Sequence, residues 1–188
     1  MLDAAVDNHL AGRYANAAEL IERADIRAVS EWSESLWGKQ RSKVLQLRKV
    51  EGAPPILGKE ARCKKRMPPI ADRLRLIARD GRNCRFCGIP VIDQKVRAAM
   101  RKAYPKELRW GTTNPEQHAA FQCMWLQYDH ILPHSRGGDN SLENMIITCA
   151  PCNYGRSEYT LEEVGLIDPR TVPVQHTVWD GLERFLFR

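Results

Sequence analysis

Two cysteine pairs of identical spacing constrain the fold of this chain more than any other feature. Cys84 and Cys87 form one CxxC pair, and Cys149 and Cys152 form the second. A CxxC pair can present both thiolates to one ion at about 2.3 Å, so two pairs complete a tetrahedral site. Because four thiolates leave no open coordination position, we expect a structural Zn²⁺ site that holds the fold and takes no part in the chemistry.

The two pairs lie far apart in the sequence, separated by residues 88–148. The site must therefore join distant segments while the chain between them loops out, and such a cross-link stabilises most when the closed loop is long. The alternative is that four reduced core cysteines share this spacing by coincidence. Cys63 and Cys123 have no partner at ligand spacing, so we expect them to be core residues or free thiols.

The cellular setting also favours metal ligands over disulfides. The first residues, MLDAAVDNHL, lack the basic-then-apolar pattern of a signal peptide, and the sequence has no apolar run of about 18 residues. We therefore expect a cytoplasmic protein without membrane contact, in which thiols stay reduced. With 43% hydrophobic residues among 188, the chain can build a modest core without disulfides.

Positive charge is concentrated in residues 39–66, which we call the basic segment. The net charge of +6 and the pI of about 9.1 suit an anionic partner but do not identify one. We interpret the basic segment as an arm that contacts phosphates, with a solvated helix and linker as the alternative. Its cationic residues are Lys39, Arg41, Lys43, Arg48, Lys49, Lys59, Arg62, Lys64, Lys65 and Arg66.

Apolar spacing and chain breakers divide the sequence into two parts. Residues 9–37 show helical spacing that predicts one or two amphipathic helices, with Trp32 and Leu36 in the core. Prolines and glycines in residues 50–69 predict a linker. We therefore expect a helical, basic N-terminal region with its linker at 1–67 and a second domain at 68–188.

The second domain is expected to mix helices and strands. The sequence predicts a helix at 70–79, ended by Asp80-Gly81 in a turn that delivers the first cysteine pair, and then the start of a strand in GIPVID. A helical insertion is predicted at 94–124, with helices at 94–103 and about 115–123. After it, the sequence predicts a strand in WLQYDHIL, an extended NMIITC and a helix from about Ala150. The tail at 159–188 is predicted to hold helices in TLEEVGL and VWDGLERFLF.

An Asp-His pair, Asp129 and His130, lies between the cysteine pairs. Hydrolysis of a phosphodiester needs a base that deprotonates water and a hard divalent cation held by oxygen ligands. Neighbours on a strand point to opposite faces, so both side chains can reach one site only where the strand is twisted, bulged or at its end. The alternative is a buried Asp–His hydrogen bond without catalytic use.

The pattern DH…P…GG…EN…CxxCN resembles the HNH endonuclease family, over about residues 79–163. Several polar and glycine positions fall in order within one segment, which makes the resemblance specific. It implies an α+β protein with a ββα-metal core, in the branch of the family that carries a structural four-cysteine zinc site.

The resemblance implies a role for four residues. His130 matches the general base that activates water, and Asp129 matches a ligand of the catalytic ion. Asn144 matches the middle Asn, which holds the loop that orients the base. Asn153 matches the second metal ligand, where family members carry His or Asn, so this chain is an H-N-N variant. An amide oxygen is harder than imidazole, so we expect Mg²⁺ or Mn²⁺ as the catalytic ion in preference to Zn²⁺.

Three further residues are candidate substrate contacts. His134 follows the base by four positions. It could contact the scissile phosphate or bind the metal ion, and the alternative is a partly exposed turn histidine with neither role. Arg136 and Arg156 can donate to phosphate oxygens. Their alternative is to be solvated surface arginines.

The expected function is that of a metal-dependent endonuclease acting on DNA, which leaves a 3′-hydroxyl and a 5′-phosphate as the resemblance implies. A homodimer would suit double-strand cleavage and a monomer would suit nicking. Two alternatives remain: a non-catalytic zinc-stabilised module that binds nucleic acid, and a nuclease specific for RNA or for a nucleic-acid structure. Residues 1–67 and the insertion at 94–124 are expected to supply recognition or dimer contacts.

Overall fold

A computed structural model describes residues 1–36 and 46–187 of the chain. The part of the basic segment that holds Lys39, Arg41 and Lys43 lies outside the described residues. The described chain combines helices with one two-stranded sheet, which confirms the predicted α+β class. Within these ranges no helix is long and apolar enough to cross a membrane.

The N-terminal region forms α1 (Leu2–Leu10), α2 (Tyr14–Arg23) and α3 (Arg27–Leu36). Helices α2 and α3 confirm the prediction for residues 9–37, and α1 precedes that range. Leu36 is buried, as predicted. The prediction for Trp32 is wrong, because 41% of this residue is exposed. The buried positions of α3 are Ser33 and Leu36, so its inner face, which packs on α6 (Ala119–Cys123), does not include Trp32.

The break in regular structure predicted at residues 50–69 and the helix after it are confirmed. Residues 46–69 contain only a 3-10 turn at Lys59–Ala61. Helix α4 (Ile70–Asp80) then ends at Gly81, whose φ of 70° lies in the region that favours glycine. The chain turns there and delivers Cys84 and Cys87, as the sequence predicts.

The insertion between the cysteine pairs is helical, as predicted, although the strand expected before it is absent. Residues of GIPVID make only isolated bridges, one of them through Pro90, which has no amide hydrogen to donate to a ladder. Helix α5 (Gln94–Ala103) starts where Asp93 accepts a bond from the Lys95 amide at 2.8 Å. The second predicted helix is short, with a 3-10 turn at Asn114–Glu116 followed by α6.

Both helices predicted in the tail are wrong. Residues 161–165 form turns, in which Gly165 adopts a φ of 68° and the Glu163 carbonyl accepts from the Arg48 amide at 2.7 Å instead of from a following helical turn. At the C-terminal end, Gly181 and Leu182 both have positive φ, so only a 3-10 turn forms at Glu183–Leu186. The end of the tail nevertheless packs on the core, as expected.

The centre of the fold is a ββα unit. Strands β1 (Leu126–His130) and β2 (Met145–Cys149) pair antiparallel, with His130 opposite Met145. Helix α7 (Ala150–Arg156) follows β2 without a break. This arrangement confirms the two predicted strands and the helix that carries Asn153.

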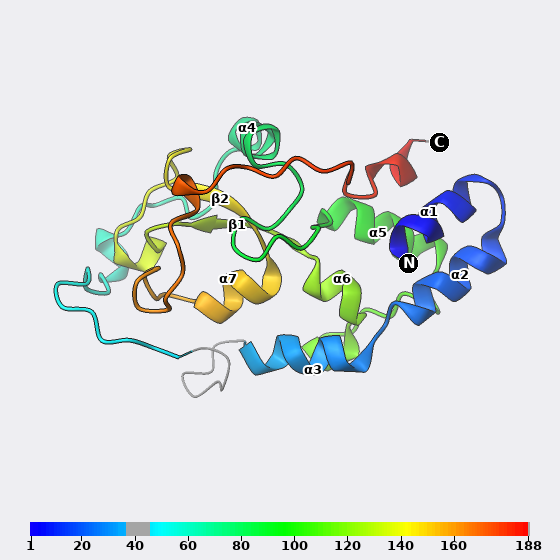
Figure 1. Ribbon diagram of the computed structural model, residues 1–188, viewed down its shortest axis with the longest axis horizontal. Helices are drawn as coiled ribbons and strands as arrows, with labels where there is room; N and C mark the ends of the chain where they lie inside the picture. The colour runs from blue at the N-terminus through cyan, green and yellow to red at the C-terminus, as the bar shows by residue number, and fades with distance from the viewer. Residues whose placement is uncertain (37–45, 188) are drawn as a thin grey trace.

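Two hydrophobic cores hold the molecule. The helical core joins residues from both sides of the predicted boundary at residue 67, so α1 and α2 share a core with the insertion and the end of the tail. Both termini lie at this end of the molecule in Figure 1. The buried members of the helical core are Leu2, Ala5, Val6, Ala17, Ile21, Ala24, Ile92, Val96, Met100, Tyr104, Leu108, Phe121, Leu182 and Phe185. We call the second core the strand core. Its buried members are Leu76, Cys84, Val91, Leu126, Met145, Ile147 and Cys149.

Candidate active site and zinc site

The fold brings the four paired cysteines together. The sulfur atoms of Cys84, Cys87, Cys149 and Cys152 all lie within 4.8 Å of one another, and the Sγ atoms of Cys87 and Cys149 are 3.6 Å apart. Sulfurs at about 2.3 Å from one Zn²⁺ in a tetrahedron are about 3.8 Å apart, so the cluster fits this ion. The thiols are free of disulfides. The cluster is therefore compatible with zinc.

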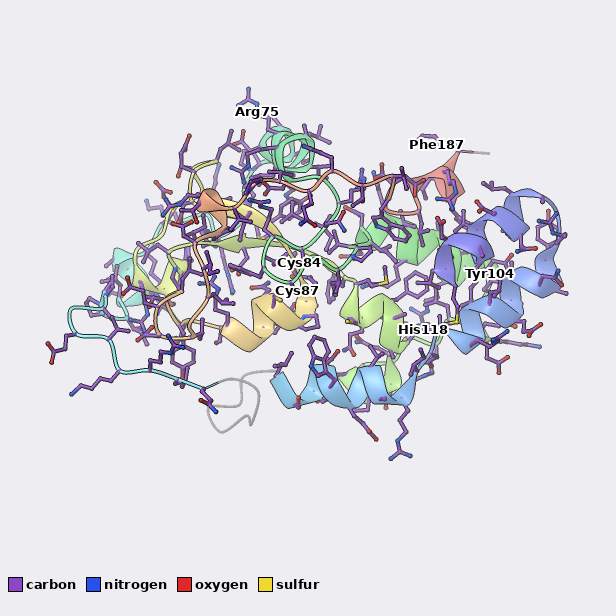
Figure 2. The ribbon with its side chains drawn as sticks, viewed as in Figure 1. Arg75, Cys84, Cys87, Tyr104, His118 and Phe187 are labelled. Atoms are coloured by element: carbon purple, nitrogen blue, oxygen red, sulfur yellow. The ribbon has the colours of Figure 1, made fainter. Side chains whose placement is uncertain are left out.

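Backbone hydrogen bonds set the position of the first cysteine pair. The amide of Gly88 donates to the Cys84 carbonyl at 2.8 Å and closes a tight turn around the pair. The Arg85 amide donates to the Ile147 carbonyl of β2 at 2.9 Å, so the turn is attached to the sheet. The second pair begins where β2 ends and α7 starts. Figure 2 shows Cys84 and Cys87 beside the start of that helix.

The two remaining cysteines lie apart from this cluster. Cys63 is exposed, and Cys123 is buried at the end of α6. Burial raises the pKa of the Cys123 thiol to about 11, which keeps it protonated and unreactive near neutral pH. The predicted core or free-thiol roles are thus confirmed.

A cleft of about 750 Å³ opens beside the ββα unit. It brings Asp129, His130 and Asn153 to one cavity, together with His134 and Arg156. Part of the basic segment forms the other wall. The residues of that wall are Lys59, Glu60, Arg62, Cys63, Lys64 and Arg66.

His130 is the last residue of β1, which lets it share the cleft with Asp129 although the two are neighbours on a strand. Its Nε2 atom lies 2.9 Å from Asn140 Oδ1. Burial lowers the pKa of the imidazole, and the bond to Asn140 and the Asp129 charge oppose this shift only in part. A histidine with such a lowered pKa is neutral at pH 7, which is the form a general base requires.

The turn between the strands is held by Asn144. Its Oδ1 atom accepts from the Leu132 amide at 2.8 Å, and its Nδ2 atom donates to the carbonyls of Leu132 at 3.2 Å and Asp139 at 2.9 Å. Gly138 passes so close that a Cβ atom there would lie 1.8 Å from the Leu132 oxygen. Only glycine fits at this position, and the side chain of Asn144 fastens the turn that follows the candidate base.

Asp129 and Arg156 form a buried ion pair. Arg156 Nη2 donates to Asp129 Oδ1 at 2.7 Å and its Nε donates to Oδ2 at 3.2 Å. The arginine also donates to the carbonyls of His130, Ile131 and Tyr159. Burial raises the pKa of the Asp129 carboxyl, while the Arg156 charge and the His130 amide favour its ionised form. Only 2% of Arg156 is exposed, so the alternative of a solvated surface arginine is wrong for this residue.

Arg136 and His134 occupy different surroundings. Arg136 donates to the Glu158 carbonyl at 2.7 Å and pairs with Glu163 at 3.0 Å, and its side chain is 8% exposed. A solvated surface arginine is therefore wrong here as well, and Arg136 does not line the cleft. His134 does line it, 5.6 Å from the His130 ring between centroids, and its Nε2 atom lies 2.7 Å from the Cys63 carbonyl oxygen.

Asp129 and Asn153 have oxygen atoms suited to a hard cation. A carboxylate offers about four lone-pair sites, and Asp129 uses three of them for Arg156 and the His130 amide, so Oδ2 keeps capacity for an ion. Asn153 donates through Nδ2 to Gln127 Oε1 at 3.3 Å, and its Oδ1 atom accepts no hydrogen bond from the described residues. Each side chain thus offers an oxygen atom of the kind that hard cations prefer.

Two features of the site were missed at the sequence level. Asn140 bonds the candidate base, and the only signal for it was its place in the SRGGDN turn. The sequence suggests a phosphate contact for Arg156, whereas its guanidinium pairs with Asp129. Pairing of residues so distant along the chain has no local signature.

The comparisons with known proteins agree with this geometry. Residues 116–158 match the model of the family described as HNH endonuclease. None of the curated proteins compared matches the chain. The matched range contains β1, the turn, β2 and α7, and it includes the second cysteine pair. The family comparison therefore identifies residues 116–158 as an HNH domain, in an α+β fold whose four clustered cysteines are compatible with zinc.

Proposed function

We propose that this protein is a metal-dependent endonuclease that hydrolyses phosphodiester bonds of DNA. The observation that carries the proposal is the shared cleft, in which His130, Asp129 and Asn153 face part of the basic segment. An HNH domain indicates a nuclease-type function and a nucleic-acid substrate. We propose in addition that the substrate is DNA and that individual residues of the cleft have the roles given below.

His130 acts as the general base in this proposal. Its lowered pKa leaves the ring neutral at pH 7, so it can take a proton from the attacking water. Asn144 acts indirectly, by holding the turn that fixes the ring. Arg156 keeps the Asp129 carboxylate oriented and ionised.

Asp129 and Asn153 would hold the catalytic ion through their side-chain oxygens. When bound, a Mg²⁺- or Mn²⁺-type ion would stabilise negative charge on the phosphate and on the leaving oxygen. Because Arg156 already neutralises Asp129, the protein alone offers little net charge to a cation. We therefore expect weak binding of the ion without nucleic acid and stronger binding when substrate phosphates complete the site.

The basic segment would bind the sugar-phosphate backbone. Lys59, Arg62, Lys64 and Arg66 line the cleft opposite the candidate base, where cations can neutralise phosphates. His134, on the same wall as the base, remains a candidate phosphate contact. Replacing Lys64 or Arg66 by Ala should weaken binding for all sequences alike and lower the salt slope by about one each.

Nicking of supercoiled plasmid tests the proposal. His130→Ala should abolish cleavage while DNA binding stays within a few-fold, and His176→Ala, at an exposed position outside the cleft, is the matched control. After EDTA treatment, Mg²⁺ or Mn²⁺ should restore activity. Cleavage by His130→Ala, or activity restored by Zn²⁺ alone, would contradict the mechanism.

The same assay separates the alternatives. DNA binding by the wild-type protein without cleavage under any metal would favour a non-catalytic binding module. Cleavage of RNA in preference to plasmid would favour an RNA-directed nuclease. Mapping the product ends distinguishes nicks from double-strand breaks and checks for the 3′-hydroxyl and 5′-phosphate.

A further inference from the structure

Asn140 lies in the turn between β1 and β2 and contacts both His130 and the basic segment. Its Oδ1 atom is 2.9 Å from His130 Nε2, and its Nδ2 atom donates to the Lys65 carbonyl at 2.6 Å. A carbonyl oxygen can only accept, so the Nδ2 end must face Lys65 and the Oδ1 end must face His130. The network itself therefore determines the orientation of the amide.

This orientation determines the tautomer of His130. Because Asn140 Oδ1 can only accept, Nε2 of the neutral ring must carry the hydrogen. The lone pair then resides on Nδ1, which has no hydrogen-bond partner among residues 1–36 and 46–187. Nδ1 is thus the atom able to accept a proton.

The backbone that Asn140 holds belongs to the basic segment. Two further bonds attach this stretch to the turn: His134 Nε2 lies 2.7 Å from the Cys63 carbonyl oxygen, and the Leu57 amide donates to the Ser135 carbonyl at 2.8 Å. With the carbonyls of residues 63 and 65 engaged, the side chains of Lys64 and Arg66 line the cleft.

We propose that Asn140 is a positioning residue that ties the His130 ring to the backbone of the basic segment, and thereby couples the candidate base to the wall that binds nucleic acid. This inference rests on the proposed function, since it concerns the same cleft. One end of the amide sets the tautomer and orientation of the base. The other end holds the phosphate-binding wall at a fixed place relative to that base.

Two substitutions separate the two ends. Asn140→Asp keeps an acceptor for His130 Nε2 and loses the donor for Lys65, so kcat should stay within a few-fold while KM for plasmid rises. Asn140→Ala loses both bonds, so kcat should fall by about 100-fold as well. Ser135→Asp places a charge in the same cleft without touching His130, and it controls for electrostatic repulsion of DNA. Equal loss of kcat in Asn140→Asp and Asn140→Ala would overturn the division of roles.

Nitrogen-15 NMR of the histidine rings gives a readout that does not need cleavage. The wild-type His130 ring should show the Nε2–H tautomer, which Asn140→Asp retains and Asn140→Ala loses, while Ser135→Asp leaves it unchanged. The chain has five histidines, so His130→Gln identifies the signal. If Asn140→Ala does not fold, the spectrum of Asn140→Asp tests the inference by itself. A His130 ring in that variant that has lost the Nε2–H tautomer would contradict the inference. An unchanged tautomer in Asn140→Ala would overturn the inference even in an active enzyme, whereas an inactive wild-type protein with the expected tautomers would contradict only the proposed function.

Discussion

The helical core and the strand core are stabilised in different ways. The helical core is built from aliphatic and aromatic side chains of α1, α2, α5 and the tail, which can exclude water without help. The strand core has few members, and two of them are zinc-candidate cysteines. A core of this size needs a cross-link, because a small apolar core does not offset the entropy lost on folding. We therefore expect the ββα unit to depend on a metal ion bound by the four cysteines.

Both regions also bury an arginine, by different means. Arg97 of α5 contacts the rings of both Trp110 and Trp125, with its guanidinium carbon 3.7 and 4.5 Å from their centroids. Burial lowers the pKa of Arg97 to about 10, and the aromatic faces stabilise the charge. Arg156 instead pairs with Asp129. The helical region thus accommodates a charge by stacking, whereas the active-site region does so with an opposite charge that is proposed to bind the ion.

Loss of one zinc ligand should have the largest effect. Cys149→Ser is expected to unfold the ββα unit, since structural Zn²⁺ contributes about 10–16 kcal/mol in small zinc domains. Hydrogen exchange should show loss of protection in β2 with retained protection in α1 and α2, and metal analysis should show loss of Zn²⁺. Cys63→Ser, at an exposed position outside the cluster, is the control. Simultaneous loss of protection in both regions would show that they unfold as one unit.

Removal of Arg156 should destabilise the active-site region by about 3–5 kcal/mol, because it leaves the Asp129 charge buried without its partner. Denaturant unfolding of Arg156→Met measures this. Arg75→Met is the matched control on the outer face of α4, where Arg75 projects from the molecule (Figure 2), and should change stability by less than about 0.5 kcal/mol. Equal effects of the two variants would rule out the buried pair.

A smaller effect is expected from trimming the helical core. Ile21→Val removes one methyl group from a fully buried site and should cost about 0.5–1.5 kcal/mol. The variant should retain zinc and keep protection in β2. The control is Ile167→Val, since Ile167 is 72% exposed. A loss of zinc in Ile21→Val would show that the helical core supports the metal site.

The smallest effect concerns pH and His118, which is buried and whose Nε2 atom is 2.9 Å from the Ile21 carbonyl oxygen. Burial lowers the pKa of His118, and the bond to Ile21 and the charge of Asp25 oppose this only in part. Between the folded value and the unfolded value of about 6.5, the unfolded chain binds more protons. The free energy of unfolding should therefore fall as the pH drops below about 6.5. His118→Gln should flatten this dependence, and the exposed His176→Gln should not.

Short-range patterns predicted many elements well, and the failures have a common origin. The extent of α5 followed from its apolar spacing, and both strands followed from their composition. The tail was mispredicted because the Glu163 carbonyl is bonded by the distant Arg48 amide and because Leu182 adopts a left-handed conformation that local preference disfavours. Trp32 was misplaced because the partner of α3, and therefore its buried face, is set by α6. Each failure reflects a contact between distant segments.

The cysteine cluster could be predicted from its ligand spacing alone, and the α+β class and the candidate site residues from the resemblance to the HNH endonuclease family. Only the tertiary structure decided that Arg156 faces Asp129, that Asn140 joins His130 to Lys65, and that the basic segment forms a wall of the cleft. The physical reason is that hydrogen bonds and ion pairs between distant segments depend on how the whole chain packs, and no local pattern encodes that geometry.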